Sequence, residues 1–285
     1  MQEQHFDIFE TLSCGSKIQH GTYNDRIYLM HAEPGSLNDL PQRLINMAKE
    51  KGYGKIFAKL PESQSGGFID SDYRVEGEIP DFYRGREKGV FLGYYLNDAR
   101  KKEADLDTYR YNKQLAMDKK NSEISPLDTS RFQLRPCNEN DLERMVEIYK
   151  TVFPSYPFPI HDTKYLRKTM KTYVDYFGVE TRGELIALSS SEKYKNALHA
   201  EMTDFATLPD WRGNGLAVHL LLKMEEKMRR QDFVTVFTIA RAASPGMNIT
   251  FAKCGYDYGG RLINNTNISG NIESMNIWFK ALSSK

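Results

Sequence analysis

The spacing of hydrophobic residues predicts several helices in the second half of the chain. Between residues 142 and 152, apolar side chains recur every three or four positions, the period of an amphipathic helix with this face in the core. These side chains are Leu142, Met145, Val146, Tyr149 and Val152. Asn138 and Asp141 precede them as an N-cap and the acid of a capping box. Residues 163–172 and 218–230 are further predicted helices.

Runs rich in β-branched and aromatic residues predict the strands between these helices. They cover residues 132–135, 174–180, 185–193, 198–207, 234–239, 256–264 and 272–279. Residues 181–184 have the composition of a hairpin turn, and three prolines make residues 153–159 a rigid loop. From residue 131 onward, the predicted order is strand, helix, helix, three strands, helix, strand, helix and two strands.

The first hundred residues predict a smaller unit. Its expected strands are residues 25–30, 55–60, 73–79 and 89–95. A helix between the first two strands should begin at Ser36 as its cap and end near Lys51 and Gly52. Residues 98–130 are dense in Lys, Asp, Asn and Ser, which is typical of a charged helix and linker. The predicted domains are residues 1–97, residues 131–285, and the linker between them.

Composition predicts a cytoplasmic protein with packed cores. The chain has 285 residues and no apolar run long enough to cross a membrane, and its first residues, Met-Gln-Glu-Gln-His, lack the layout of a signal peptide. The three cysteines are far apart and form no C-x-x-C pair, so neither a disulfide framework nor a metal site is expected. With a net charge of +1, the protein has no strong positive electrostatic field to attract a nucleic acid backbone. This favours small-molecule partners and leaves a homodimer open.

The segment A-T-L-P-D-W-R-G-N-G-L-A, residues 206–217, predicts a phosphate-binding turn between a strand and a helix. Gly213 and Gly215 allow backbone conformations that direct successive N–H groups toward an anion at the positive end of the helix. Arg212 can add charge-assisted hydrogen bonds to the same oxygens. A plain packing turn is the competing interpretation, because short glycine turns before helices are common.

This turn, R-G-x-G-[LI]-[AG] with a Pro three residues before the Arg, resembles the coenzyme A loop of the GNAT-type N-acetyltransferases. Downstream, N-I-T-F-A-K-C-G-Y at residues 248–256 resembles that family's N-x-x-x-x-x-x-G-[FY] helix and turn. The resemblance implies an α/β (α+β) fold with a mixed, splayed sheet and flanking helices, and acetyl-CoA as co-substrate. The segment E-G-E-I-P-x-F-Y near residue 80 resembles the end of such a domain, so residues 1–97 are expected to be a degenerate acetyltransferase-like copy.

Longer segments resemble one branch of the family, the β-lysine N6-acetyltransferases, which make the compatible solute N6-acetyl-β-lysine. They are Gln19-His-Gly, Asn24-Asp-Arg-Ile-Tyr-Leu-Met30, Phe153-Pro-Ser-Tyr-Pro157, Asn264-Asn265 and Glu273-Ser-Met-Asn276. This likeness implies β-lysine as substrate and a role in osmoadaptation. The alternatives are acetylation of another small amine or of a protein lysine, and a sensor that binds coenzyme A without turnover.

The resemblance also assigns roles in the site. Acetyl transfer requires a base, and the family often has a carboxylate on the strand before the coenzyme turn, here Glu201 first and Asp204 second. These two face opposite sides of a regular strand unless a bulge intervenes. The usual proton donor is a Tyr where this chain has Phe251, so Tyr256 and Tyr258 are the candidate replacements, with core packing as the competing interpretation for both.

The expected binding residues fall into two groups. For the coenzyme they are the N–H groups of Phe205, Ala206 and Thr207, the turn Arg212, Gly213, Asn214, Gly215, Leu216 and Ala217, and Asn248. For β-lysine they are Arg241 at its carboxylate, Asn264, Asn265 and Glu273 at its amino acid head, and Tyr156 and Phe158 along its aliphatic chain. A plain turn at the two asparagines is an equal alternative.

Overall fold

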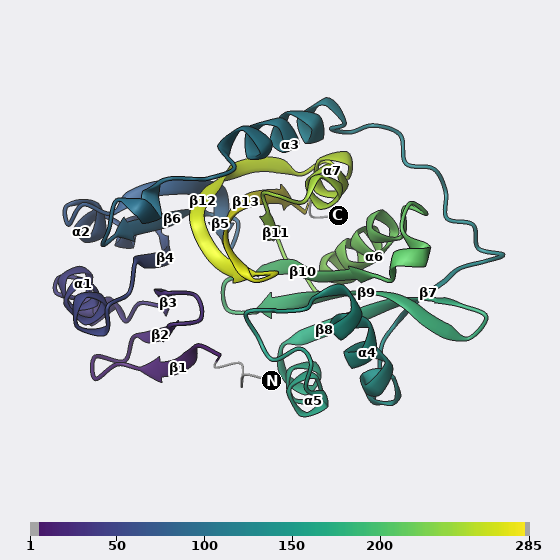
Figure 1. Cartoon of the computed structure of the whole chain (residues 1–285), viewed down its shortest axis with the longest axis horizontal. Helices are drawn as coiled ribbons and strands as arrows, with labels where there is room; N and C mark the ends of the chain where they lie inside the picture. Colours follow the sequence, from purple (N-terminus) through teal and green to yellow (C-terminus); the bar gives the residue numbers. More distant parts are fainter. Residues whose placement is uncertain (1–5, 283–285) are drawn as a thin grey trace.

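The computed structural model describes residues 6–282, so the first five residues, on which the signal-peptide prediction depended, lie outside the described part. Within that part, all strands join in one mixed sheet in the order β1-β2-β3-β4-β6-β5-β12-β13-β11-β10-β9-β8-β7. Figure 1 shows helices on both faces of the right-hand part, with α6 and α7 on one face and α4 and α5 on the other. The predicted α/β class with a mixed sheet is confirmed.

The elements follow the predicted order closely in the second half. The first half contains β1 (Ile8–Thr11), β2 (Lys17–Gly21), β3 (Arg26–His31), η1 (Pro34–Ser36), α1 (Leu40–Lys51), β4 (Lys55–Pro61), η2 (Glu62–Gln64), α2 (Gly66–Ile69), β5 (Arg74–Tyr83) and β6 (Glu87–Tyr95). The linker contains η3 (Ala99–Lys101) and α3 (Leu106–Asp118). The second half contains β7 (Gln133–Pro136), η4 (Glu139–Asp141), α4 (Leu142–Val152), α5 (Thr163–Thr172), β8 (Val174–Thr181), β9 (Glu184–Tyr194), β10 (His199–Thr207), η5 (Pro209–Trp211), α6 (Leu216–Arg230), β11 (Thr235–Arg241), α7 (Pro245–Lys253), β12 (Asp257–Ile268) and β13 (Asn271–Ala281).

The two halves repeat one strand pattern outward from the centre of the sheet. The order β5-β6-β4-β3-β2-β1 in the first half matches β12-β13-β11-β10-β9-β8 in the second. Each half has one parallel pair, β3 with β4 and β10 with β11, and a long helix, α1 or α6, connects the strands of that pair. Among residues 6–97, the first half has no counterpart of β7, α4 and α5. The division into separate domains stays a prediction, because both halves contribute to one sheet.

Two glycines join the halves at the centre of this sheet. Gly77 of β5 pairs with Gly260 of β12, and a Cβ on Gly260 would lie 2.4 Å from the Cα of Gly77. The close approach therefore requires glycine at position 260. The β12–β13 hairpin, yellow in Figure 1, lies between the two halves. Lys55 also connects them, since its ammonium donates to Glu76 and to the carbonyl of Ile263 at 2.7 Å each.

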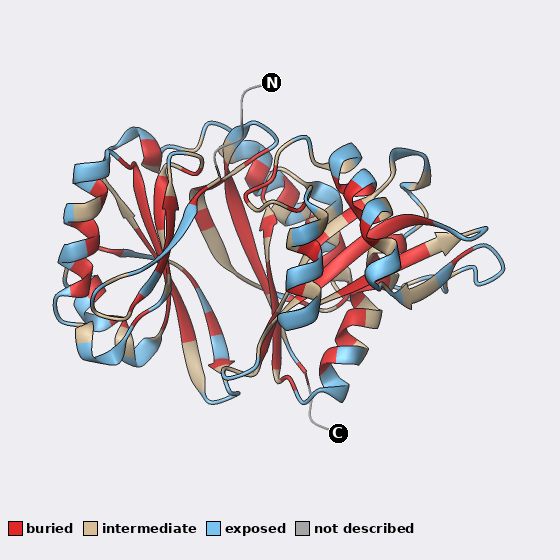
Figure 2. Ribbon diagram, turned by 90° about the horizontal axis from the view of Figure 1, so that it is seen from below, coloured by how far each residue is buried: buried red, intermediate tan, exposed pale blue. Residues whose placement is uncertain are grey.

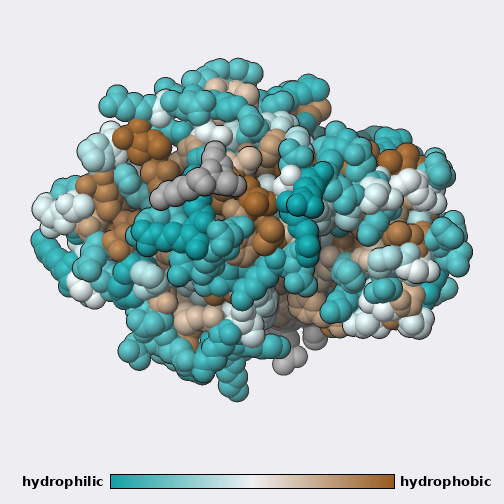
Figure 3. Space-filling view, turned by 180° about the vertical axis from the view of Figure 1, so that it is seen from behind, coloured by the Kyte–Doolittle hydropathy of each residue, from teal (hydrophilic) through white to brown (hydrophobic). Residues whose placement is uncertain are grey.

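Hydrophobic cores lie on both faces of the sheet and between the halves. Phe57 and Phe91 of the first half and Phe237 and Ile277 of the second form part of the core that joins them. Figure 2 shows that buried residues follow the strands and the inner helix faces, while the outer helix faces are exposed. On the face seen in Figure 3, hydrophilic side chains predominate and hydrophobic ones form small patches.

In the first half, the predicted start of one helix was wrong and two strands were missed. The helix predicted to begin at Ser36 begins at Leu40, because Pro34 to Ser36 form a separate 3-10 turn. Its predicted end is confirmed by Gly52, whose φ of +71° closes the helix. Strands β1 and β2 were missed. All four residues of β1 are exposed, so no alternating pattern indicates it in the sequence.

Candidate active site

Strands β10 and β11 separate in the middle of the sheet. Their parallel pairing covers only His199–Glu201 against Thr235–Phe237, although both strands continue beyond these residues. A cleft of about 700 Å³ occupies the gap that follows. Its walls include Phe205 and Thr207 on β10 and Ile239 and Arg241 on β11. The unpaired backbone of both strands is therefore available to a ligand in this cleft.

The glycine turn forms one end of the cleft. Gly213 and Gly215 have φ angles of +84° and +70°, and a Cβ at either position would meet no atom within 4 Å. Gly215 is also the N-cap of α6, and no side chain caps that helix end. The first N–H groups of a helix have no acceptor within the helix, so the turn presents donors at the positive end of the dipole. Arg212 and Lys253 line the same cleft and add two positive charges.

A β-bulge at Asp204 changes which residues of β10 face the cleft. Thr203 pairs with Ser190 and Ala206 with Leu188, so two residues of β10 lie opposite one residue of β9. Asp204 has a φ of +55°, a conformation that Asp tolerates better than most residues. As a consequence, Glu201 and Asp204 lie on the same face, although their odd spacing would separate them in a regular strand.

Asp204 is buried and accepts three hydrogen bonds from side chains, the weakest of them from the hydroxyl of Thr203 at 3.5 Å. The hydroxyl of Tyr156 donates to one carboxylate oxygen at 2.5 Å, and that of Ser190 donates to the other at 2.6 Å. Burial raises the pKa of Asp204, and the hydroxyl donors Ser190, Tyr156 and Thr203 oppose this rise by stabilising the ionised form. Because both oxygens are engaged, Asp204 is less accessible to a substrate proton than Glu201.

Glu201 and Glu192 form a pair of carboxylates beside the cleft. They occupy directly opposite positions on β10 and β9, and both are half-buried. The pKa of Glu201 is raised to about 7, chiefly by burial. The charge of Lys59 opposes this rise, the charge of Asp204 adds to it, and a hydrogen bond from the backbone of Ile239 opposes it. Burial and the charge of Glu201 raise the pKa of Glu192 well above its ordinary value. A carboxylate with a pKa near neutrality is suited to accept a proton at physiological pH.

The first half of the chain faces this carboxylate pair. Tyr28 and Phe57 lie on neighbouring strands with their rings 4.8 Å apart, and both belong to the core that contacts Phe237. Strand alternation places Lys59 on the same face as Phe57. The charge of Lys59 favours the ionised forms of Glu192 and Glu201, which shows that the two halves interact electrostatically at this point.

The structure brings most of the predicted coenzyme residues to the cleft. Those that line it are Phe205, Thr207, Arg212, Gly213, Gly215, Leu216 and Ala217. Ala206 faces the core on the α4 side, and Asn214 donates its side-chain amide to the carbonyl of Trp211. Asn248 is fully buried, where it donates to the carbonyls of Arg241 and Ser244 and accepts from Trp278. Its contact with coenzyme stays a prediction.

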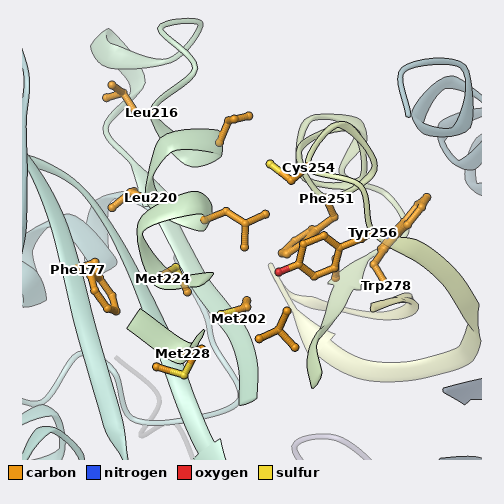
Figure 4. Close-up of a cluster of buried hydrophobic side chains, with 14 of the residues drawn as sticks. Phe177, Met202, Leu216, Leu220, Met224, Met228, Phe251, Cys254, Tyr256 and Trp278 are labelled. Atoms are coloured by element: carbon orange, nitrogen blue, oxygen red, sulfur yellow. The ribbon is translucent and has the colours of Figure 1, made fainter. Parts of the chain in front are cut away.

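The candidate proton donors lie away from the cleft. Tyr256 is fully buried, and Figure 4 shows it beside Phe251 in the core between α6 and α7. Burial raises its pKa well above the ordinary value. The ring of Tyr258 packs against Trp278, with centroids 5.3 Å apart. Among the described residues, Tyr156 is the only tyrosine that lines the cleft.

The predicted substrate residues are divided between the cleft and the interface of the halves. Tyr156 and Arg241 line the cleft, but the guanidinium of Arg241 forms a bidentate ion pair with Glu273 at 2.6 and 2.9 Å. Phe158 packs against the α4 core. Asn264 donates to the carbonyls of Arg100 and Lys102, and the carbonyl of Asn265 accepts from Arg26. These two asparagines therefore connect β12 to the first half and the linker.

Several residues of the site were missed by the sequence analysis. They are Lys59, Ser190, Glu192 and Lys253. Lys59 had a detectable signal, since it interrupts the apolar residues that follow Lys55 in the predicted strand 55–60. Glu192 had no such signal in the sequence, because the register of β9 and β10 places it opposite Glu201.

Comparison with known proteins agrees with this geometry. Residues 142–256 match the model of the "Acetyltransferase (GNAT) family". Beta-lysine N(6)-acetyltransferase of Methanococcus maripaludis is 38% identical over 270 residues, which are 93% of this chain and 96% of that protein. The chain belongs to the GNAT family of acetyltransferases. This GNAT enzyme thus belongs to a family whose members use acetyl-CoA.

Two further relatives of the GNAT enzyme match along most of their length. N-acetyltransferase YodP of Bacillus subtilis is 33% identical, covering 93% of this chain and 95% of that protein. Beta-lysine N(6)-acetyltransferase of Methanosarcina mazei is 29% identical, covering 87% of this chain and 98% of that protein. The matches include the first half, so the relatives share both halves and not the cleft region alone.

No helix within residues 6–282 has the length and apolar character needed to cross a membrane. In the same residues, no three or more His, Cys, Asp or Glu side chains are arranged to hold a metal ion.

Proposed function

We propose that this acetyltransferase moves the acetyl group of acetyl-CoA onto the N6-amine of β-lysine, which gives the compatible solute N6-acetyl-β-lysine. The observation that carries the proposal is the carboxylate pair of Glu192 and Glu201 beside a cleft that ends in a glycine turn. The names of two relatives support β-lysine as the amine. A diamine is a suitable partner for a site with several buried carboxylates.

The cleft fits the elongated shape of acetyl-CoA. The turn at Gly213 and Gly215 offers N–H donors for the pyrophosphate, with Arg212 and Lys253 as counter-charges. The pantetheine arm would lie along the unpaired edge of β10 at Phe205 and pair with its backbone as another strand does. The thioester would then lie near the bulge at Asp204, three residues along β10 from Glu201.

Glu201 is the proposed base. An ammonium group has an ordinary pKa near ~10.4, so only about one molecule in 10³ is neutral at pH 7. Glu201 takes the first proton, and the amine lone pair then forms a C–N bond to the thioester carbonyl. The C–S bond breaks, and the thiolate receives the second proton of the amine as it leaves. The products are an amide and free coenzyme A.

Thiol release measured with acetyl-CoA and a panel of amines tests this function. We expect β-lysine to give the highest kcat/KM, with one acetyl group on N6 by mass spectrometry. Faster turnover of another diamine or of a lysine-containing peptide would assign a different substrate to the same chemistry. Binding of coenzyme A without thiol release from any amine would support the sensor alternative instead.

A further inference from the structure

Lys59 on β4 is a buried cation without a hydrogen-bond partner. Its side chain is 5% exposed, and its ammonium has no partner among the described residues. Aromatic rings surround it, with the ammonium 4.4 Å from the ring centroid of Tyr194 and 5.0 Å from that of Phe237. A buried charge is costly unless an opposite charge or hydrogen bonds compensate it, and the rings compensate it only in part.

The surroundings of Lys59 place it within reach of the proposed substrate site. Tyr194 and Glu192 are two residues apart on β9, a spacing of about 6–7 Å along one face of a strand. Phe237 lies directly beside Glu201 on the neighbouring strand. Lys59 thus lies over the same patch of sheet as the two carboxylates. The bulge and the cleft lie farther along β10 in the same direction.

The charges on this patch are complementary to a diamino acid. β-Lysine carries two amines and one carboxylate, and the patch carries two half-buried carboxylates, Glu192 and Glu201, and one unpartnered ammonium. A molecule with the opposite arrangement of charges would satisfy all three groups at once.

We infer that Lys59, from the first half of the chain, binds the carboxylate of the substrate while Glu192 and Glu201 bind its amino groups. This inference rests on the proposed function and names the subsite that makes the enzyme selective for an amino acid over a simple diamine. It also gives the first half a role in specificity. Arg241, the candidate from sequence, is less suitable because Glu273 already neutralises its guanidinium.

The test compares two substrates on one variant, Lys59→Met. Methionine keeps the length of the side chain among the rings and removes only the charge, and loss of an unpaired buried charge does not threaten folding. The substrates are β-lysine and 1,4-diaminopentane, which is the same diamine without the carboxylate. A charge-assisted hydrogen bond contributes about 1.5–3 kcal/mol, so the ratio of kcat/KM for β-lysine over the diamine should fall roughly tenfold to a hundredfold.

The substrate ratio separates this role from a general effect on the carboxylates. Loss of the Lys59 charge also changes the pKa of Glu201, which affects both amines and cancels in the ratio. Lys59→Arg should restore part of the ratio, because guanidinium also binds carboxylate. An unchanged ratio in Lys59→Met, with either equal loss or no loss for the two amines, would overturn the inference.

Failure of the proposed function is detected separately. If the wild-type protein releases no thiol with β-lysine, the proposed reaction is wrong. Calorimetric titration of the two amines into protein saturated with coenzyme A then measures the subsite without turnover. The inference requires that β-lysine binds at least about tenfold more tightly than 1,4-diaminopentane and that Lys59→Met removes the difference. Equal affinities would contradict it.

Discussion

Glu192 and Glu201 occupy directly opposite positions on the antiparallel strands β9 and β10, so their carboxylates share one face of the sheet. Two like charges at such positions destabilise each other, so the pair contributes nothing favourable to the sheet when both carboxylates are ionised. The pair lies between the bulge at Asp204 and the ammonium of Lys59. A strained arrangement of this kind is typical of a functional site, because it raises pKa values into the range of catalysis.

The first prediction concerns the pH dependence of catalysis. Glu201 accepts a proton only when it is ionised, so kcat/KM should rise with pH and level off above about 7, the raised pKa of this group. Glu201→Gln should lower kcat by about 10² to 10⁴ and remove this rise. Glu192→Gln removes a neighbouring negative charge, so the rise should move to lower pH. A wild-type profile that is flat between pH 5 and 8 contradicts the role of Glu201.

The second prediction concerns the glycine turn. Gly213→Ala forces a residue with a Cβ into a φ of +84°, at a cost of about 1–2 kcal/mol of stability, and should raise the KM for acetyl-CoA as the turn changes shape. Gly183→Ala is the matched control, because Gly183 has a φ of +79° in the β8–β9 hairpin and also has open space around it. Both variants should lose similar stability, measured by denaturant unfolding. If Gly183→Ala raises the KM equally, the turn has no special role.

The third prediction concerns the hydroxyl that holds Asp204. Tyr156→Phe removes the hydrogen bond to a buried carboxyl group and should cost about 1–3 kcal/mol of stability, with a lower kcat, because the bulge residue loses its orientation. Tyr149→Phe is the control within the same core, since the buried hydroxyl of Tyr149 has no partner among the described residues. Tyr149→Phe should leave the stability and kcat nearly unchanged. Identical behaviour of the two variants would show that the bond to Asp204 is unimportant.

The fourth prediction concerns the proton donor for the leaving thiolate. Tyr256 lies in the core and not at the cleft, so Tyr256→Phe should change kcat by less than about twofold, measured by thiol release at saturating substrates. Phe251→Tyr places a phenol where the family usually has one, since Phe251 lines the cleft. This variant should keep or increase kcat. A loss of about 10² in Tyr256→Phe would instead identify Tyr256 as the donor.

Features set by neighbouring residues in the chain were predictable. Asn138 and Asp141 form the predicted capping box before α4, and α5 has the predicted bounds of residues 163 and 172. The turn at Gly213 and its position before α6 were also visible in the sequence. Each of these features depends on contacts within a few residues, so the local pattern contains the necessary information.

Other features depend on residues far apart in the chain. The sequence shows that Glu201 and Asp204 have odd spacing, but the bulge that puts them on one face comes from the pairing of β10 with β9. The ion pair between Arg241 and Glu273 links positions 32 residues apart, so two side chains predicted to bind substrate bind each other.

The sequence by itself determined the family fold and the glycine turn before α6, and it named Glu201 as the candidate base. The tertiary structure decided which charges meet Glu201: Glu192 through strand register, and Lys59 through the packing of the first half onto the second. The physical reason is that a turn or a helix cap depends on the backbone conformations of a few neighbouring residues. An electrostatic site depends instead on strand register and packing across the whole sheet.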